Sequence, residues 1–260
     1  MCRFDPKIHV VIEGAEFADY FWPAVEQYVE CTHEYWRSNG KFVPNIVLRL
    51  ASGGYIGGGL YHSQNIEGAL ATLPGARIVC PSFADDAAGL LRTAMRSRGF
   101  TLYLEPKALY NSVEASSVVP EEFEVPFGKA RIRREGTDLS MITYGNTTHF
   151  CLNVAERLAQ EGWSVEVIDL RSLIPLDKET IYASVKKTSK ALVVHEDKVF
   201  SGFGAEIAAG IGTELFRYLD APVQRVGSVF TPVGFHPILE KAILPTEDKI
   251  YDAARTLLEY

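Results

Sequence analysis

The chain of 260 residues has little of what several protein classes require. Its four cysteines, Cys2, Cys31, Cys80 and Cys151, are scattered, which fits neither a disulfide framework nor the paired spacing of a structural zinc site. No stretch approaches the roughly 18 consecutive apolar residues that a membrane-spanning helix needs. The first residues show no small-residue cleavage pattern, so we expect no secretory signal. These absences favour buried thiols in a reducing compartment.

Positive charge is also scarce, because 26 Lys and Arg residues face 33 Asp and Glu residues and leave a formal net charge of −7. Binding to nucleic acid or to anionic lipid needs clustered positive charge, and the sequence contains no block of Lys and Arg. We therefore expect no nucleic-acid partner and no membrane partner. Hydrophobic residues make up 47% of the chain, which is enough to bury a substantial core and argues against intrinsic disorder.

Apolar strand-like runs alternate with helix-like segments along the whole chain. The expected strands are Ile8–Ile12, Asn45–Leu50, Arg77–Cys80, Thr101–Leu104, Leu139–Tyr144, Ser164–Leu170 and Ala191–Glu196. The expected helices are 22–39, Asp85–Arg98, Thr147–Glu161, Lys178–Lys187, Gly204–Tyr218 and Glu247–Leu258. This alternation predicts α/β units with parallel sheets covered by helices on both faces. Residues 107–127 are rich in Asn, Ser, Glu and Pro, so we expect a linker there and two domains, 1–119 and 120–260.

The most distinctive segment is Ser52–Gln64, SGGYIGGGLYHSQ, in which five glycines follow an expected strand. Glycine permits positive φ and the close approach of a ligand, and open α/β sheets bind ligands beyond the carboxyl ends of their strands. The spacing is neither a dinucleotide fingerprint nor a phosphate loop. His62 ends the segment, and a neighbouring Ser63 or Gln64 is able to fix the tautomer of its imidazole. Most loop histidines are merely hydrogen-bonded, but the glycine context favours a functional role for His62.

The remaining candidates are less distinctive. His195 follows an apolar strand beside two carboxylates, which suits catalysis or hydrogen bonding at a domain interface, and the interface is favoured. Glu13 and Glu16 are candidates for orienting a heterocycle, although loop carboxylates are more often solvated or capping a helix. The other histidines are interpreted as structural or surface residues: His9, His33, His149 and His236. No metal-ligand spacing is visible, so residue chemistry alone indicates an α/β enzyme-like chain.

Five segments in one order carry the strongest signal. They are EFADYFWPAVEQ (16–27), GGYIGGGLYHSQNIEGALATLPGARIVCPSFADDAAGLL (53–91), YLEPKALY (103–110), VEVIDLRSLIPLDKETIYASVKKTSKALVVHE (165–196) and SGFGAEIA (201–208). In combination they resemble the beta subunit, or the C-terminal half of a fused chain, of the thiamine-diphosphate-dependent 2-oxo acid dehydrogenases. FADYFWPA and GGLYHSQ are more similar to the branched-chain members than to the pyruvate members.

The resemblance implies an N-terminally incomplete pyrimidine-binding domain followed by a transketolase C-terminal-like domain. It implies a thiamine diphosphate site shared with an alpha subunit or N-terminal half, which mainly holds magnesium. His62 matches the family's loop histidine. Tyr20 matches the aromatic residue packed on the pyrimidine ring, and Phe17 and Glu16 match positions that line the pocket.

The resemblance also implies a reaction and partners. The reaction is oxidative decarboxylation of a 2-oxo acid with acyl transfer to lipoamide, and the chain is expected to be inactive without its alpha partner. Further partners are a second copy of the chain and the lipoyl acyltransferase core. Without a targeting segment, the expected compartment is the bacterial cytoplasm, or the mitochondrial matrix in a eukaryote.

Two departures from the family pattern keep alternatives open. The family's cofactor-activating glutamate lies upstream of the first residue here, and neither Glu13 nor Glu16 matches it. Residues 96–100 read RSRGF where branched-chain relatives carry an acidic residue and Asn-Pro associated with a structural potassium ion, which puts that ion in doubt. The alternatives are a non-catalytic truncated or scaffold homologue and a transketolase or deoxyxylulose-phosphate synthase fragment, although the latter fits LEPKALY and YHSQ poorly.

Overall fold

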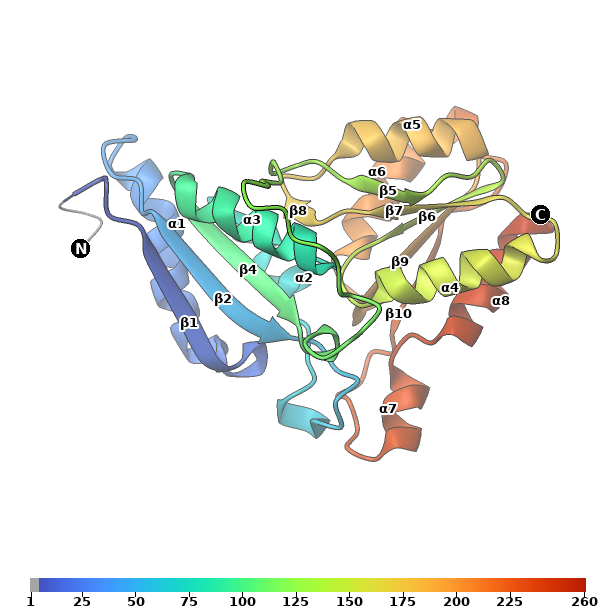
Figure 1. Ribbon diagram of the computed structural model, residues 1–260, viewed down its shortest axis with the longest axis horizontal. Helices are drawn as coiled ribbons and strands as arrows, with labels where there is room; N and C mark the ends of the chain where they lie inside the picture. Colours follow the sequence, from blue (N-terminus) through green and yellow to red (C-terminus); the bar gives the residue numbers. More distant parts are fainter. Residues whose placement is uncertain (1–4) are drawn as a thin grey trace.

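The computed structural model describes residues 5–260, and the side chains of all of these except Ala15 and Glu16. Two α/β units lie side by side, each built on one sheet with helices on both faces (Figure 1). The first unit is coloured blue to green in Figure 1, apart from one yellow strand of residues 172–174, and the second is coloured green to red. No helix among the described residues is long and apolar enough to cross a membrane.

The first sheet has the strand order β1-β2-β4-β3-β8. Its strands are β1 (Val10–Phe17), β2 (Ile46–Ser52), β3 (Ala76–Val79), β4 (Phe100–Pro106) and β8 (Ser172–Ile174). The first four are parallel, whereas β8 comes from much later in the chain and pairs antiparallel with β3. On one face pack α1 (Val25–Arg37) and α2 (Glu67–Leu70), and on the other packs α3 (Ala84–Arg96).

The second sheet has the order β10-β9-β6-β7-β5. Its strands are β5 (Arg131–Arg134), β6 (Leu139–Thr143), β7 (Val165–Asp169), β9 (Ala191–Lys198) and β10 (Gln224–Ser228), of which only β5 is antiparallel to its neighbour. One face carries α5 (Lys178–Thr188) and α6 (Gly204–Glu214), and the other carries α4 (Thr147–Ala159) and α8 (Glu247–Leu258). A separate short helix, α7 (Pro237–Ile243), lies beside the loop that follows β2 (Figure 1).

Residues 5–260 also contain five short 3-10 turns: η1 (Ala18–Tyr20), η2 (Trp22–Ala24), η3 (Gly59–Tyr61), η4 (Lys107–Leu109) and η5 (Phe216–Tyr218). The central strands β6 and β7 are buried at every position, because helices cover both of their faces. Side-chain caps mark where three helices begin, and at α7 the Nδ1 of His236 accepts a hydrogen bond from the backbone N–H of Ile238 at 3.3 Å. Asp177 accepts a hydrogen bond from the backbone N–H of Thr180 at α5, and Thr246 accepts one from Lys249 at α8.

The predicted α/β architecture is confirmed, but two details of it are wrong. Each sheet carries an antiparallel edge strand, so neither is purely parallel. The first strand runs on to Phe17, so Glu13 and Glu16, expected in a loop, lie in β1. Cys80 and Cys151 are buried thiols as expected, Cys31 is partly buried, and Cys2 lies outside the described residues.

Polar bridges join the two units where β3 and α3 meet β7 and β8. Asp86, at the start of α3, accepts hydrogen bonds from Arg171 at 2.7 Å and from Arg133. Ser82 donates to Asp169 at 2.9 Å. The carboxylates of Asp86 and Asp169 are fully buried, so these bridges fix the relative position of the two sheets.

Candidate active site

His62 lies between two aromatic side chains at the end of the loop that follows β2. Its ring centroid is 5.0 Å from that of Phe17 and 5.4 Å from that of Tyr20, and both pairs are edge-to-face. The Tyr20 hydroxyl is 3.3 Å from Nε2 of His62, within hydrogen-bonding distance. Phe17 ends β1 and Tyr20 ends η1, so the carboxyl end of β1 supplies both aromatic groups. The structure therefore brings together His62, Tyr20 and Phe17, three of the four predicted site residues.

The fourth predicted residue, Glu16, lies in β1, but its side chain is outside the described part of the structure. Glu13 is 4.0 Å from Arg49, and its side chain is 69% exposed. The sequence leaves the role of Glu13 open between orienting a heterocycle, solvation and helix capping, and this exposure favours solvation, although its position in a strand was not expected.

His62 is partly exposed, and several apolar or aromatic side chains close to His62 or Tyr20 in the sequence are exposed as well. Tyr20 is 45% exposed and Tyr61 is 69% exposed. Trp22 and Leu60 are similarly uncovered. Contiguous exposed apolar side chains mark interaction sites on soluble proteins. His62 is therefore accessible to a ligand or to another polypeptide.

Two carboxylates of the second unit hydrogen-bond the backbone of the glycine-rich loop Ser52–Gln64. Glu196 of β9 accepts a hydrogen bond from the backbone N–H of Gly54, and Glu240 of α7 accepts one from Gly57 at 3.2 Å. Gly59 has a φ of +65°, and a Cβ there would come within 3.3 Å of Phe235. Glycine is needed at position 59 for both the left-handed backbone and this close approach.

Lys107 and Asp19 form a buried ion pair beneath His62. The side chains are 2% and 4% exposed, and the charged atoms lie 3.6 Å apart. The Lys107 ammonium donates a hydrogen bond to the backbone carbonyl of His62 at 2.7 Å and lies 4.2 Å from the centre of the Phe17 ring. Burial lowers the pKa of Lys107, and the negative charges of Asp19 and Glu196 oppose that effect.

Three carboxylates from both units meet behind this loop. Glu67 accepts a hydrogen bond from the Tyr144 hydroxyl at 3.1 Å, and Asp197 accepts one from the backbone N–H of Gly68 at 3.2 Å. Burial, reinforced by the charge of Asp197, raises the pKa of Glu67 to about 8. Burial also raises the pKa of Glu196 to about 7 and raises the pKa of Asp197. Low-dielectric surroundings disfavour the charged form of each carboxyl group.

His195 is fully buried behind these carboxylates. Its ring stacks on that of Tyr144 with centroids 6.5 Å apart, and burial lowers its pKa to about 4. A neutral histidine that faces no cleft suits packing better than proton transfer at the surface. The interpretation of His195 as a supporting residue agrees with this position. His149 is also buried, and its Nε2 lies 2.8 Å from the carbonyl oxygen of Ser82.

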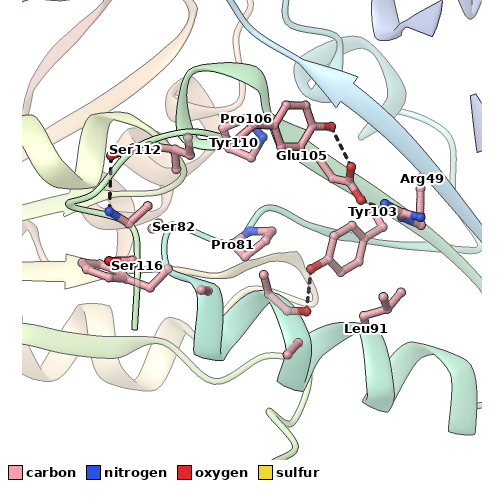
Figure 2. Close-up of a pocket in the computed structure, with 16 residues that line it drawn as sticks. Arg49, Pro81, Ser82, Leu91, Tyr103, Glu105, Pro106, Tyr110, Ser112 and Ser116 are labelled. Atoms are coloured by element: carbon pink, nitrogen blue, oxygen red, sulfur yellow. Dashed lines mark hydrogen bonds and ion pairs between the residues drawn. The ribbon is translucent and has the colours of Figure 1, made fainter. Parts of the chain in front are cut away.

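A cavity of about 410 Å³ lies between α3, the end of β4 and the segment that follows η4 (Figure 2). Its polar groups are already paired with protein atoms. Tyr103 donates to the carbonyl of Ala87, and both Arg49 and Tyr110 donate to Glu105, each at 2.7 Å. The cavity therefore presents a mainly apolar lining, and none of the described site residues lines it. Among the side chains that the structure describes, no cluster of three or more His, Cys, Asp or Glu is arranged to hold a metal ion.

Comparison with known proteins places the chain in a family. Residues 7–113 match the transketolase pyrimidine-binding domain, and residues 128–250 match the transketolase C-terminal domain. A solved structure described as a split-gene transketolase, inactive beta4 tetramer, superposes with a TM-score of 0.73 at 21% sequence identity, over 96% of this chain and 75% of that chain. At this level of identity the superposition shows a shared fold.

Closer relatives share 38–40% identity. The 2-oxoisovalerate dehydrogenase subunit beta of Bacillus subtilis is 40% identical over 96% of this chain and 76% of its own length. The 2-oxoisovalerate dehydrogenase subunit beta 2, mitochondrial, of Arabidopsis thaliana is 38% identical over 96% of this chain and 70% of its own length. The pyruvate dehydrogenase E1 component subunit beta of Bacillus subtilis is 39% identical over 86% of this chain and 69% of its own length.

The fold and the two domain matches define a protein of the transketolase type, with a pyrimidine-binding domain followed by a transketolase C-terminal domain. Sequence identities of 38–40% to its relatives assign the chain to one family within this class. The chain belongs to the family of E1 beta subunits of the thiamine-diphosphate-dependent 2-oxo acid dehydrogenases. The family resemblance and the two-domain fold predicted from the sequence are thereby confirmed.

Proposed function

We propose that this chain is the beta component of a 2-oxo acid dehydrogenase that decarboxylates a branched-chain 2-oxo acid or pyruvate together with an alpha partner. The observation that carries the proposal is the meeting of Phe17, Tyr20 and His62 on an accessible surface at the carboxyl end of β1. The relatives of the chain, which include beta subunits of 2-oxoisovalerate and pyruvate dehydrogenases, support this substrate class.

The residues around His62 fit the aminopyrimidine part of thiamine diphosphate. An aromatic heterocycle packs favourably against aromatic rings, and Phe17 and Tyr20 supply two of them beside the imidazole. These two side chains would hold the ring, while diphosphate and magnesium fall to the alpha partner in this proposal. When bound, the cofactor supplies the electron sink for decarboxylation.

We assign to His62 the proton transfer that accompanies the acyl-transfer step. Its Nε2 faces the Tyr20 hydroxyl at 3.3 Å, so the tyrosine orients the ring and influences which nitrogen carries the proton. The partly exposed imidazole is able to donate a hydrogen bond or a proton to a lipoyl sulfur that enters from the open side. The chain's own contribution is therefore orientation of the cofactor ring and placement of one proton.

The apolar surface around the site suits the proposed partners. Tyr61 and Leu60 lie exposed on η3, and Phe235 and Ile238 lie exposed at α7 next to the same loop. Covering this surface with the alpha partner would remove apolar area from water, at roughly 25 cal/mol for each Å². We further assign a second copy of the chain and the lipoyl acyltransferase core as partners of the complete enzyme.

Reconstitution tests the proposal. The chain is mixed with the alpha partner, thiamine diphosphate, magnesium and 2-oxoisovalerate or pyruvate, and carbon dioxide release is measured. Release that requires both proteins is expected. Absence of release with every 2-oxo acid tested, although a stable complex with the alpha partner forms, would overturn catalysis and favour a scaffold role.

The variant His62→Gln separates the two halves of the reaction. Because His62 is assigned to acyl transfer, the rate with lipoamide should fall by about 10²–10⁴-fold, the usual range for loss of a general acid or base. Carbon dioxide release with an artificial electron acceptor should fall much less. His9→Gln, a change at a partly buried histidine that precedes β1, serves as the matched control. Equal loss in both assays would contradict the assigned role.

A further inference from the structure

We infer that Lys107 is a positioning residue for His62, acting through one buried ammonium group that contacts both the backbone and the aromatic neighbour of the imidazole. Its Nζ donates a hydrogen bond to the His62 carbonyl at 2.7 Å. The same Nζ lies 4.2 Å from the centre of the Phe17 ring, and that ring meets the imidazole edge-to-face at 5.0 Å. The ammonium therefore constrains the imidazole from its backbone and from its ring side.

Asp19 extends this arrangement to the other end of the tripeptide 62–64. Its Oδ2 is 3.6 Å from the Lys107 ammonium, and its Oδ1 accepts a hydrogen bond from the backbone N–H of Gln64 at 2.8 Å. The cation thus holds the carbonyl of His62, and the anion holds the N–H of Gln64. The buried ion pair Lys107–Asp19 brackets the backbone that carries the imidazole.

The position of Lys107 in the fold makes it a rigid support. It is the first residue of η4 and directly follows β4, which pairs with β2 on one side and β3 on the other. Sites supported by central strands are held more firmly than sites supported only by loops. Lys107 therefore connects the loop that carries His62 to the centre of the first sheet, and this connection makes the loop more rigid.

Lysine suits this task for a chemical reason. Its ammonium is a compact charge with three donors, so one group can serve a carbonyl, a carboxylate and an aromatic face together. Water cannot readily replace it, because the side chains of both Lys107 and Asp19 are almost fully buried. Substitution of Lys107 would leave the carboxylate of Asp19 without its countercharge and the His62 carbonyl without its donor.

Spectroscopy of His62 tests the inference without any assay of catalysis. Histidine side chains are labelled with ¹⁵N in the wild-type chain, Lys107→Met, Lys107→Arg and Lys190→Met, and the His62 signals are identified by their loss in His62→Gln. Lys190 also donates to a backbone carbonyl, that of Leu258 at 3.1 Å, so it is a matched control in the second unit. The rate at which diethyl pyrocarbonate modifies His62 is followed by mass spectrometry of the same proteins.

We expect Lys107→Met to shift the His62 ring signals and to change the modification rate of His62 at least about threefold. In Lys190→Met, both the His62 ring signals and the modification rate should equal those of the wild type. Lys107→Arg keeps the charge but not the compact head group, so it should give an intermediate shift. If Lys107→Met does not fold, Lys107→Arg decides the question. Unchanged His62 signals and an unchanged modification rate in the folded Lys107 variants would overturn the inference.

A kinetic test of the role of Lys107 rests on the proposed function and uses the complex with the alpha partner. A misplaced catalytic group costs about 10²-fold in rate for a shift near 1 Å, so kcat for acyl transfer to lipoamide should fall about 10–100-fold in Lys107→Met. KM for the 2-oxo acid should change little, because the side chain of Lys107 is only 2% exposed. A raised KM with unchanged kcat would contradict positioning. An inactive wild-type complex would refute the proposed function and leave the spectroscopic test of Lys107 intact.

Discussion

Glu67 shows how burial of a single carboxyl group makes the stability of the chain depend on pH. It is 1% exposed between the two sheets, and its pKa of about 8 lies far above the value of about 4.3 for an unperturbed glutamate. The folded state therefore binds one more proton than the unfolded state between these two pH values. The stabilising contribution of Glu67 is complete below the unfolded pKa and is lost as pH rises through the folded pKa.

The variant Glu67→Gln tests this linkage. Wild-type stability should contain a component that falls between pH 5 and pH 8, and the neutral amide of Gln should remove that component. Urea unfolding of both proteins at several pH values measures the slope. Glu114→Gln, at an exposed position, should leave the slope unchanged. Identical slopes in the wild type and in Glu67→Gln would rule out the proposed titration.

At the residue scale, sequence reasoning found the groups with local signals and missed the groups without them. The sequence indicates a role for His62 because five glycines precede it in one loop, and for Tyr20 and Phe17 through family resemblance. Lys107 lies in the quoted segment YLEPKALY, yet nothing in its local sequence indicates a buried ammonium. Its role depends on contacts with His62 and Asp19, which lie 45 and 88 positions away in sequence (107 − 62 and 107 − 19).

At the element scale, the long helices and central strands were predictable and the short pieces were not. β6, β7 and β9 read as apolar runs because helices bury them on both faces. β8 has three residues, which is too short for any periodic pattern, and it exists only because β3 offers an edge. α7 was missed because Ile238 and Leu239 point outward, so the helix shows no buried apolar face.

Helix α6 supplies a prediction about packing. A Cβ at Gly204 would overlap the imidazole of His195, whereas a Cβ at Gly212 in the same helix would meet nothing within 4 Å. Gly204→Ala should therefore destabilise the chain by about 1–3 kcal/mol through overpacking. Gly212→Ala should stabilise it by about 0.5–1 kcal/mol, because alanine favours the helix. Denaturant unfolding measures both, and equal effects of the two substitutions would contradict this packing.

At the scale of the whole molecule, the junction between the two units depends on buried charge. Asp86 is fully buried at the start of α3 and faces Arg171 at 2.7 Å and Arg133. Arg171 lies between β7 and β8, so this ion pair ties the first unit to the point where the chain crosses from one sheet to the other. Removal of one partner of a buried pair leaves an uncompensated charge, which is strongly destabilising.

Asp86→Asn should lower the free energy of unfolding by about 3–5 kcal/mol, the usual cost of breaking a buried ion pair. The neighbouring change Asp85→Asn is the matched control, because Asp85 pairs with Arg131, whose side chain is 45% exposed, and ion pairs open to solvent contribute only about 0–1 kcal/mol. Urea unfolding of both variants gives the comparison. A smaller loss for Asp86→Asn than for Asp85→Asn would show that the junction is held by other contacts.

The crossing of β8 into the first sheet limits how this protein can be divided. Expression of the N-terminal half alone would leave the hydrogen-bonding groups along the outer side of β3 without the strand that covers them in the whole chain. Such uncovered edges recruit strands from neighbouring molecules. The two halves are therefore not interchangeable modules, and recombination of either with a distant relative would have to transfer residues 172–174 together with the half they complete.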